Sequence, residues 1–459
     1  PMKVIVCGAG QVGYNIARYL AEQKNDVTVI DRSARLIRKI GEMLDVQAIE
    51  GFASDPSLLE QAGAEEAEMI VAVTLSDEVN MVACQVAHSM FDVPTKIARI
   101  RNQSYLARQW SDLFTRDNLP IDVVISPEVE VAEAIYRRLE VPGAFDTIPF
   151  ADDRVRVLGL WLDESCPVID TPLRQLTELF PDLAVRVLAV LRHGRLFVPT
   201  PDDHMEVGDG VYIAVETSQV ARAMGVFGHE EEEARRVVVV GGGSVGLFLL
   251  RRLEARTPRV HLKMIERDEE RAALVADKLN RTIVLHGDCL DPEILREANV
   301  AETETIVAVT NNDEANILTC LLAKNEGTER AISLINNPVY TPLVSSLGID
   351  VRVDPREMTV STILRHIRRG RIRDLHSIGD GAAEIIEAEM LDTSPLSGKT
   401  VADARLPRGV MVGAVIRKDE VILPKGSTEF LPGDRVVILA ATDSVRSLEQ
   451  LFAARLEYF

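Results

Sequence analysis

The chain has 459 residues, too many for one ordinary domain of about 150 residues, and 46% of them are hydrophobic, enough to fill several cores. Its formal net charge of -20 argues against binding to nucleic acid or to an anionic membrane surface, which both attract basic proteins. No window is apolar over the roughly 20 residues that a membrane helix needs, and no cleavable signal peptide is evident, so we expect a cytoplasmic protein.

The first quarter of the chain alternates short β-branched runs with helical patterns. The runs are KVIVCG (3–8), DVTVID (26–31), VQAIEG (46–51), EMIVAVT (68–74), TKIARIR (95–101) and DVVISP (122–127). Strands that alternate with helices predict a parallel, doubly wound sheet of the Rossmann type.

A glycine-rich turn follows the first of these runs, and a helical pattern follows the turn. Its spacing, G-x-G-x-x-G, is given by Gly8, Gly10 and Gly13, with Gln11 and Val12 between the last two. The first glycine permits a tight turn, the second lets a pyrophosphate approach the backbone, and the third lets the helix pack against the strand. The free N–H groups at the helix start then favour phosphate, so these five residues are candidate nucleotide contacts.

Other candidate contacts stand at the carboxyl ends of the strands, where such sheets bind their ligands. Asp31 ends the second strand and can accept hydrogen bonds from ribose hydroxyls. A carboxylate there disfavours a 2′-phosphate, so we expect NAD(H) or ATP/ADP and not NADP. Thr74 and Leu75 follow the fourth strand as possible adenosine or ribose contacts, and Arg99 and Arg101 follow the fifth, where cations can meet phosphates.

A different pattern follows residue 126. Apolar residues at helical spacing predict a connecting helix from Pro127 to Leu139. Short alternating strands and one helix come next, which predicts a small α+β module. The strands are VRVLGLWL (155–162), VRVLAVLR (185–192), RLFVP (195–199) and GVYIAVET (210–217), and the helix is TPLRQLTELF (171–180).

The whole pattern then repeats after roughly 230 residues, a period too long for a solenoid. VAVTLSDEVNMVACQVA (71–87) runs against VAVTNNDEANILTCLLA (307–323). The corresponding nucleotide candidates are Gly241, Gly243, Ser244, Val245, Gly246, Glu266 and Thr310. The predicted domains are 2–125 and 230–353 for nucleotide binding, 126–144 and 354–374 as connecting helices, and 145–229 and 375–459 as small domains.

The two nucleotide sites are unequal in sequence. Leu334 and Asn336 stand where the first half has Arg99 and Arg101, so the second site lacks these two phosphate-binding cations. We therefore hypothesise that the first site acts as a switch and the second as a scaffold or second input.

No residue pattern typical of catalysis or metal binding accompanies these sites. The five cysteines are scattered and the eight histidines share no motif, so we expect reduced thiols, no catalytic residue and no metal site. Asp77, Glu78 and Asn80 are more simply a helix start than a cation site. A basic run at 365–375 is either a solvated helix face or a partner contact.

The duplicated unit resembles the RCK (also called KTN) family that regulates Trk-type potassium uptake. The resemblance rests on GAGQVG, a ribose acid, AVT-x-x-D-E-x-N, ARIR and a small module with a Gly-Asp pair, and it covers essentially the whole chain. It implies two Rossmann-like domains, each followed by a small α+β domain. It also implies a non-enzymatic peripheral subunit on the inner face of the plasma membrane, bound to a potassium channel or transporter of the TrkH/TrkG type.

The resemblance further implies a homo-oligomeric gating ring, commonly a tetramer, whose shape changes when NAD(H), ATP or ADP is exchanged. By the same resemblance the family's nucleotide residues correspond to Gly8, Gly10, Gly13, Asp31, Thr74, Leu75 and Arg99 in the first half and to Gly241, Gly243, Gly246 and Glu266 in the second. The alternative from another class is an NAD-dependent oxidoreductase with an unidentified substrate. A redox-sensing transcription regulator ranks last, because the chain lacks basic charge and a helix-turn-helix pattern.

Overall fold

The computed structural model describes residues 2–231, 234–256, 260–367, 372–379 and 381–452. The chain forms two compact units. Unit 1 comprises Pro1–Ile135 and Arg235–Leu364, and unit 2 comprises Tyr136–Ala234 and Arg365–Phe459. Each unit therefore contains corresponding parts of both halves of the duplication.

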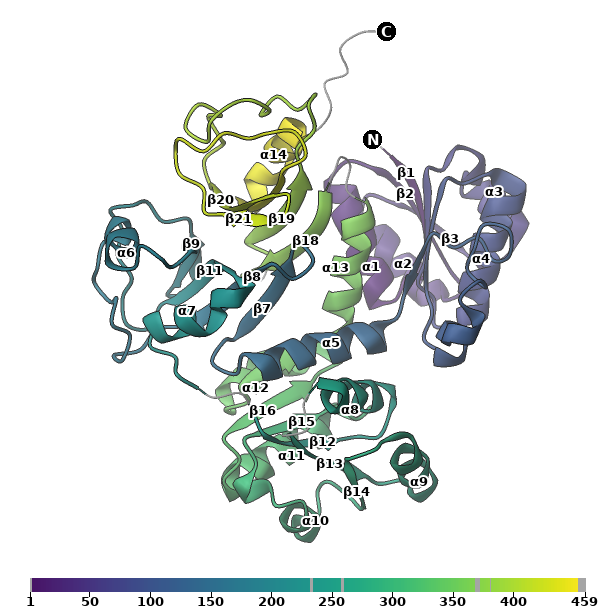
Figure 1. Ribbon diagram of the computed structural model, residues 1–459. Coiled ribbons are helices and arrows are strands. Elements are labelled where there is room, and N and C mark those ends of the chain that lie inside the picture. Colours follow the sequence, from purple (N-terminus) through teal and green to yellow (C-terminus); the bar gives the residue numbers. More distant parts are fainter. Residues whose placement is uncertain (1, 232–233, 257–259, 368–371, 380, 453–459) are drawn as a thin grey trace. The chain divides into compact units, whose positions relative to one another are not determined.

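The first half of unit 1 is a doubly wound parallel sheet in the order β3-β2-β1-β4-β5-β6. Its strands are β1 (Lys3–Cys7), β2 (Asp26–Asp31), β3 (Gln47–Glu50), β4 (Met69–Ala72), β5 (Thr95–Arg99) and β6 (Val123–Ile125). Helices α1 (Gln11–Glu22) and α2 (Ala34–Met43) cover one face, and α3 (Pro56–Gln61) and α4 (Asp77–Phe91) cover the other (Figure 1). Burial on both faces explains why these strands are almost continuously apolar.

The second half of unit 1 repeats this sheet in the order β14-β13-β12-β15-β16-β17. The strands are β12 (Arg236–Val240), β13 (His261–Glu266), β14 (Ile283–His286), β15 (Thr305–Ala308), β16 (Arg330–Leu334) and β17 (Val351–Val353). The helices are α8 (Ser244–Arg256), α9 (Glu269–Lys278), α10 (Pro292–Glu297), α11 (Asp313–Glu326) and α12 (Thr341–Ser346). In both sheets the strand order reverses beside the first strand, which is where ligands bind in such folds.

Unit 2 consists of two antiparallel sheets. The first, in the order β10-β9-β11-β8-β7, contains β7 (Asp146–Phe150), β8 (Val155–Trp161), β9 (Val185–Arg192), β10 (Arg195–Phe197) and β11 (Gly210–Glu216), with α6 (Leu173–Leu179) and α7 (Val220–Val226). The second, in the order β18-β19-β22-β20-β21, contains β18 (Ile372–Ile378), β19 (Ala383–Glu389), β20 (Val410–Arg417), β21 (Glu420–Ile422) and β22 (Arg435–Ala441), with α14 (Val445–Phe452). The tandem α/β and α+β fold class is confirmed.

The two sheets of unit 2 share a hydrophobic core. Phe150 and Leu188 from the first module belong to the same buried cluster as Ile385 and Leu439 from the second. Arg435 joins the modules as well, since it pairs with Glu387 of its own sheet at 2.6 Å and with Asp152 of the other module at 2.8 Å. Unit 2 is thus a single body built from both copies of the small module.

Helices α5 (Pro127–Glu140) and α13 (Pro355–Ile367) begin in unit 1 and end in unit 2. The predicted helix 127–139 matches α5. The range 354–374 contains more than its helix, because β18 already begins at Ile372. Of the basic run at 365–375, Arg373 pairs with Glu389 at 2.5 Å, while residues 368–371 lie outside the described part of the chain.

Candidate functional site

The glycine loop between β1 and α1 packs tightly at two of its glycines and is open at the third. A side chain on Gly8, whose φ is +113°, would place its Cβ 2.9 Å from the carbonyl oxygen of Val73. A Cβ on Gly13 would lie 1.8 Å from the carbonyl oxygen of Gly8. Gly10 has no neighbour within 4 Å of such a Cβ and caps α1. The loop therefore leaves open space at the helix start, where an anion is favoured.

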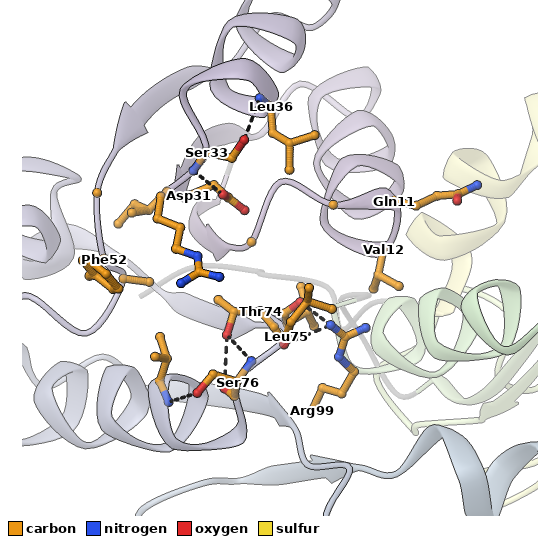
Figure 2. Close-up of a pocket in the computed structure, with 18 of the residues that line it drawn as sticks. Gln11, Val12, Asp31, Ser33, Leu36, Phe52, Thr74, Leu75, Ser76 and Arg99 are labelled. Atoms are coloured by element: carbon orange, nitrogen blue, oxygen red, sulfur yellow. Dashed lines mark hydrogen bonds between the residues drawn. The ribbon is translucent and has the colours of Figure 1, made fainter. Parts of the chain in front are cut away.

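The Asp31 carboxylate holds this loop in place. Its Oδ2 accepts a hydrogen bond from the N–H of Ala9 at 2.7 Å, and its Oδ1 accepts one from the N–H of Ser33 at 2.7 Å. Each carboxylate oxygen has two acceptor positions, so both remain able to accept from ribose hydroxyls. Figure 2 shows the Asp31 side chain among the residues that line a pocket beside the glycine loop.

Asn80, for which the sequence favoured a helix start over a cation site, fixes the end of β4. Its Oδ1 accepts from the N–H and the hydroxyl of Thr74 at 2.9 and 2.6 Å, and its amide donates to the carbonyl of Arg99 at 2.9 Å. Asp77 acts similarly, since it accepts from the N–H groups of Arg101 and Asn102 at 3.0 and 2.7 Å. Their repetition at Asn316 and Asp313 was a signal that could have indicated this role.

The two arginines at the end of β5 have different partners. Arg99 donates through Nη2 to the carbonyls of Val73 and Thr74 at 2.7 and 2.9 Å. Burial, and then the positive charge of Arg101, lower the pKa of Arg99 to about 10, so it is charged at neutral pH. Arg101 instead pairs through Nε with Glu128 at 3.3 Å. Arg99 is therefore a cation without a carboxylate partner among the described hydrogen bonds and ion pairs.

These elements enclose a cavity of about 590 Å³, here called the first pocket. Its lining includes most of the candidates in the first half, namely Gly8, Gly10, Gln11, Val12, Asp31, Thr74, Leu75 and Arg99, but not Gly13 or Arg101. Sequence reasoning missed Arg32, Ser33, Leu36 and Phe52, which also line it.

The first pocket has an apolar end suited to a flat ring. Phe52 follows β3 and is 56% exposed, and in the view of Figure 2 it lies at one end of the pocket while Val12 and Arg99 lie at the other. An exposed aromatic ring beside a carboxylate can stack on a nucleobase whose ribose bonds to that carboxylate. The exposed phenylalanine in IEGFASDP was the available sequence signal.

The second glycine loop has nearly the same backbone geometry. Glu266 accepts from the N–H of Gly242 through Oε2 at 2.6 Å and from the N–H of Asp268 through Oε1 at 2.8 Å. Gly246 packs against its own loop, because a Cβ there would lie 2.1 Å from the carbonyl oxygen of Gly241. Thr310 is tied to Asn316 as Thr74 is tied to Asn80.

The space around the second loop is different. Arg271 stands where the first half has Leu36, and its Nε donates to the carbonyl of Gly242 at 2.5 Å, so the side chain lies over the loop. Asp288 replaces Phe52. A cavity of about 500 Å³ is lined by Gly243, Ser244, Val245 and Asn311 of this half, but Glu266 and Thr310 are not part of its lining. The second glycine loop therefore lines this cavity, but the Glu266 carboxylate does not.

The described residues contain neither a membrane-spanning helix nor a metal-binding cluster. No described helix combines the length and apolarity that crossing a membrane requires. Among the same residues, no group of three or more histidine, cysteine, aspartate or glutamate side chains is placed to hold a metal ion.

Two family models each match the chain twice. The TrkA-N domain matches residues 4–127 and 237–355, and the TrkA-C domain matches residues 162–228 and 385–453. The chain is 49% identical over 458 residues to the Trk system potassium uptake protein TrkA of Azorhizobium caulinodans, and 38% identical over 462 residues to that of Halomonas elongata. Each alignment covers all of both chains.

Solved structures with the same fold include the GsuK RCK domain, with a TM-score of 0.59 at 17% identity over 98% of this chain and 95% of that one. The GsuK channel bound to NAD has a TM-score of 0.59 at 17% identity and covers 98% of this chain and 79% of that chain. At such low identity these likenesses establish the fold alone.

Proposed function

The chain belongs to the TrkA family, and from this premise we propose that it is the nucleotide-sensing regulatory subunit of a Trk-type potassium uptake system. The curated relatives are named as potassium uptake proteins, which agrees with a non-enzymatic protein and disfavours the alternative of an NAD-dependent oxidoreductase.

The proposed ligand is NAD(H) or an adenine nucleotide such as ATP or ADP, bound in the first pocket. The observation that carries this proposal is the alignment of three groups along one cavity: Phe52 for the base, Asp31 for the ribose and the open loop at Gly10 for the phosphates. The Asp31 carboxylate would repel a 2′-phosphate, so NADP is expected to bind poorly. A solved protein of the same fold, the GsuK channel, is bound to NAD.

Ligand binding would affect helix α5 through Arg101. Its guanidinium pairs with Glu128 in the first turn of α5, and α5 continues from unit 1 into unit 2. A phosphate near Arg99 competes with Glu128 for the neighbouring Arg101, so ligands of different charge favour different positions of this helix. A ligand can shift that equilibrium only by its differential affinity for the two arrangements.

The proposed partner is a membrane potassium channel or transporter of the TrkH/TrkG type. The chain would act at the inner face of the plasma membrane as a homo-oligomeric ring, a tetramer by the family resemblance, whose shape follows nucleotide exchange. Size-exclusion chromatography with light scattering measures the stoichiometry directly, and a monomer in the presence of nucleotide would contradict the ring.

The function can be tested by potassium flux into vesicles that contain the membrane subunit and this chain. We expect nucleotide to change the flux with wild-type protein and to have little effect with Asp31→Ala. Asp26→Ala is a matched control, because Asp26 lies at the exposed opposite end of the same strand. Flux that does not respond to nucleotide with wild-type protein, or that responds equally with both variants, would contradict the proposal.

A further inference from the structure

The first pocket contains one residue from the second half of the chain. This residue is Arg356, in the first turn of α13, and it belongs to the same compact unit as the pocket. The neighbouring cavity of about 500 Å³ is also lined by Arg356, and the two cavities share Val12, Leu75 and Arg99 as well. The first pocket therefore adjoins this second cavity at the end that lies away from Phe52.

The second cavity is rich in positive charge, and we call it the arginine cavity. Its lining contains Arg99, Arg101, Arg271 and Arg356, with Glu128 as the lining carboxylate. Glu128 pairs with Arg101, whereas Arg99 and Arg271 donate to backbone carbonyls. Carbonyl groups carry no net charge and do not neutralise a guanidinium. The positive charges of Arg99 and Arg271 therefore remain available to an anion that enters this cavity.

Arg356 is held by one acid but keeps donor capacity. Its Nε lies 3.4 Å from Oδ1 of Asp354, a nearly buried carboxylate that also lies 3.9 Å from Arg352. Its Nη2 is buried and has no hydrogen-bond partner among the described residues. A buried donor left unpaired costs free energy, which a ligand acceptor would recover.

We propose that the arginine cavity takes the terminal phosphate of a nucleoside di- or triphosphate bound in the first pocket, and that Arg356 of the second half contacts that phosphate. The inference rests on the proposed nucleotide site. With the base at Phe52 and the α-phosphate at the start of α1, the phosphate chain continues past Val12 toward Arg99 and Arg356. NAD would bring its nicotinamide nucleoside, which has no terminal phosphate, to the same place.

The proposal gives the arginine a function that a single half could not supply. A longer phosphate chain would be held by both halves at once, so the affinity should rise from AMP to ADP to ATP. Because Arg356 stands at the start of α13, the terminal phosphate would also favour one position of that helix.

Calorimetric titration with AMP, ADP and ATP tests the inference on wild-type full chain, Arg356→Gln and Arg352→Gln. Arg352 is the matched control, since it also pairs with Asp354 but lines neither cavity. We expect Arg356→Gln to weaken ATP binding about tenfold or more, the effect of losing a charge-assisted contact, and to leave AMP binding unchanged. The control should bind all three nucleotides as wild type does.

Other outcomes separate this inference from the proposed function. Unchanged ATP affinity in Arg356→Gln, or an equal loss for AMP and ATP, would overturn the inference alone. If no nucleotide binds wild-type protein, both fail. Arg356→Lys is a second variant that guards against a folding artefact, because it keeps the positive charge. It should retain part of the preference for ATP over AMP. Equal affinities for ATP and AMP in a folded Arg356→Lys protein would also contradict the contact.

Discussion

The open space at Gly10 and the close contact at Gly13 lead to opposite expectations for the same substitution, glycine to alanine. An alanine at residue 10 has room, because no atom lies within 4 Å of its Cβ and φ is -65°, which any residue adopts. An alanine at residue 13 places its Cβ 1.8 Å from the backbone oxygen of Gly8. Helix α1 can accommodate it only by moving away from β1.

The magnitudes follow from these two environments. Gly10→Ala should leave the free energy of unfolding unchanged or raise it by about 0.4–1 kcal/mol, because the unfolded chain loses conformational freedom. Gly13→Ala should lower it by about 1–3 kcal/mol, the usual cost of overpacking against a structure that must shift. Yet Gly10→Ala should weaken nucleotide binding about tenfold or more, because a methyl group then occupies the place where the backbone meets the pyrophosphate.

Thermal melts and ADP calorimetry measure the two effects separately. The melting temperature should fall for Gly13→Ala and stay within a degree or so, or rise, for Gly10→Ala. Gly225→Ala in helix α7 is a control outside both cavities, where the added Cβ also meets nothing within 4 Å. Wild-type ADP affinity in Gly10→Ala would refute the placement of phosphate over this loop, and a wild-type melt for Gly13→Ala would refute the packing argument.

Three further expectations concern buried polar groups. Asn80→Ala removes the ties to Thr74 and the β5 carbonyl and should cost about 1–3 kcal/mol of unfolding free energy, seen in denaturant melts; an unchanged midpoint would contradict it. Burial raises the pKa of the Cys84 and Cys320 thiols to about 12, so a thiol reagent at pH 8 should label neither without denaturant, and rapid native labelling would disprove the burial. Although burial acts to raise it, hydrogen bonds from Arg192 lower the pKa of Asp209. That stabilisation is present above the unfolded-state pKa of about 3.9 and is lost as the pH falls through the lower folded-state pKa. The loss of unfolding free energy caused by Arg192→Gln should therefore shrink in melts at acid pH. A loss that does not change with pH would contradict the pairing.

The sequence predicted the sheets well because their strands are buried on both faces and are therefore continuous apolar runs. Strand β7 was missed for the opposite reason: DTIPF is an edge strand that contains Pro149, and prolines are confined to such edges. Helix α7 was missed too, since its short pattern, VARAMGV, lacks a strong start signal.

The candidate site was predictable only where one local segment forms it. The glycine loop and Asp31 come from a single strand–turn–helix–strand unit, whose spacing carries the geometry. Arg356 joins the first pocket from a position far along the chain, and Arg271 lies over the second loop through a long side chain. Contacts of that kind depend on tertiary packing and leave no periodic signal.

The most direct test of the unequal sites is calorimetric counting of nucleotide sites with NAD, NADH, ATP and ADP on wild type, Asp31→Ala and Glu266→Ala. If the first pocket is the working site, binding is lost with Asp31→Ala and kept with Glu266→Ala. Binding that survives Asp31→Ala, or a separate binding step lost with Glu266→Ala, would contradict this claim and make the second loop a nucleotide site in its own right.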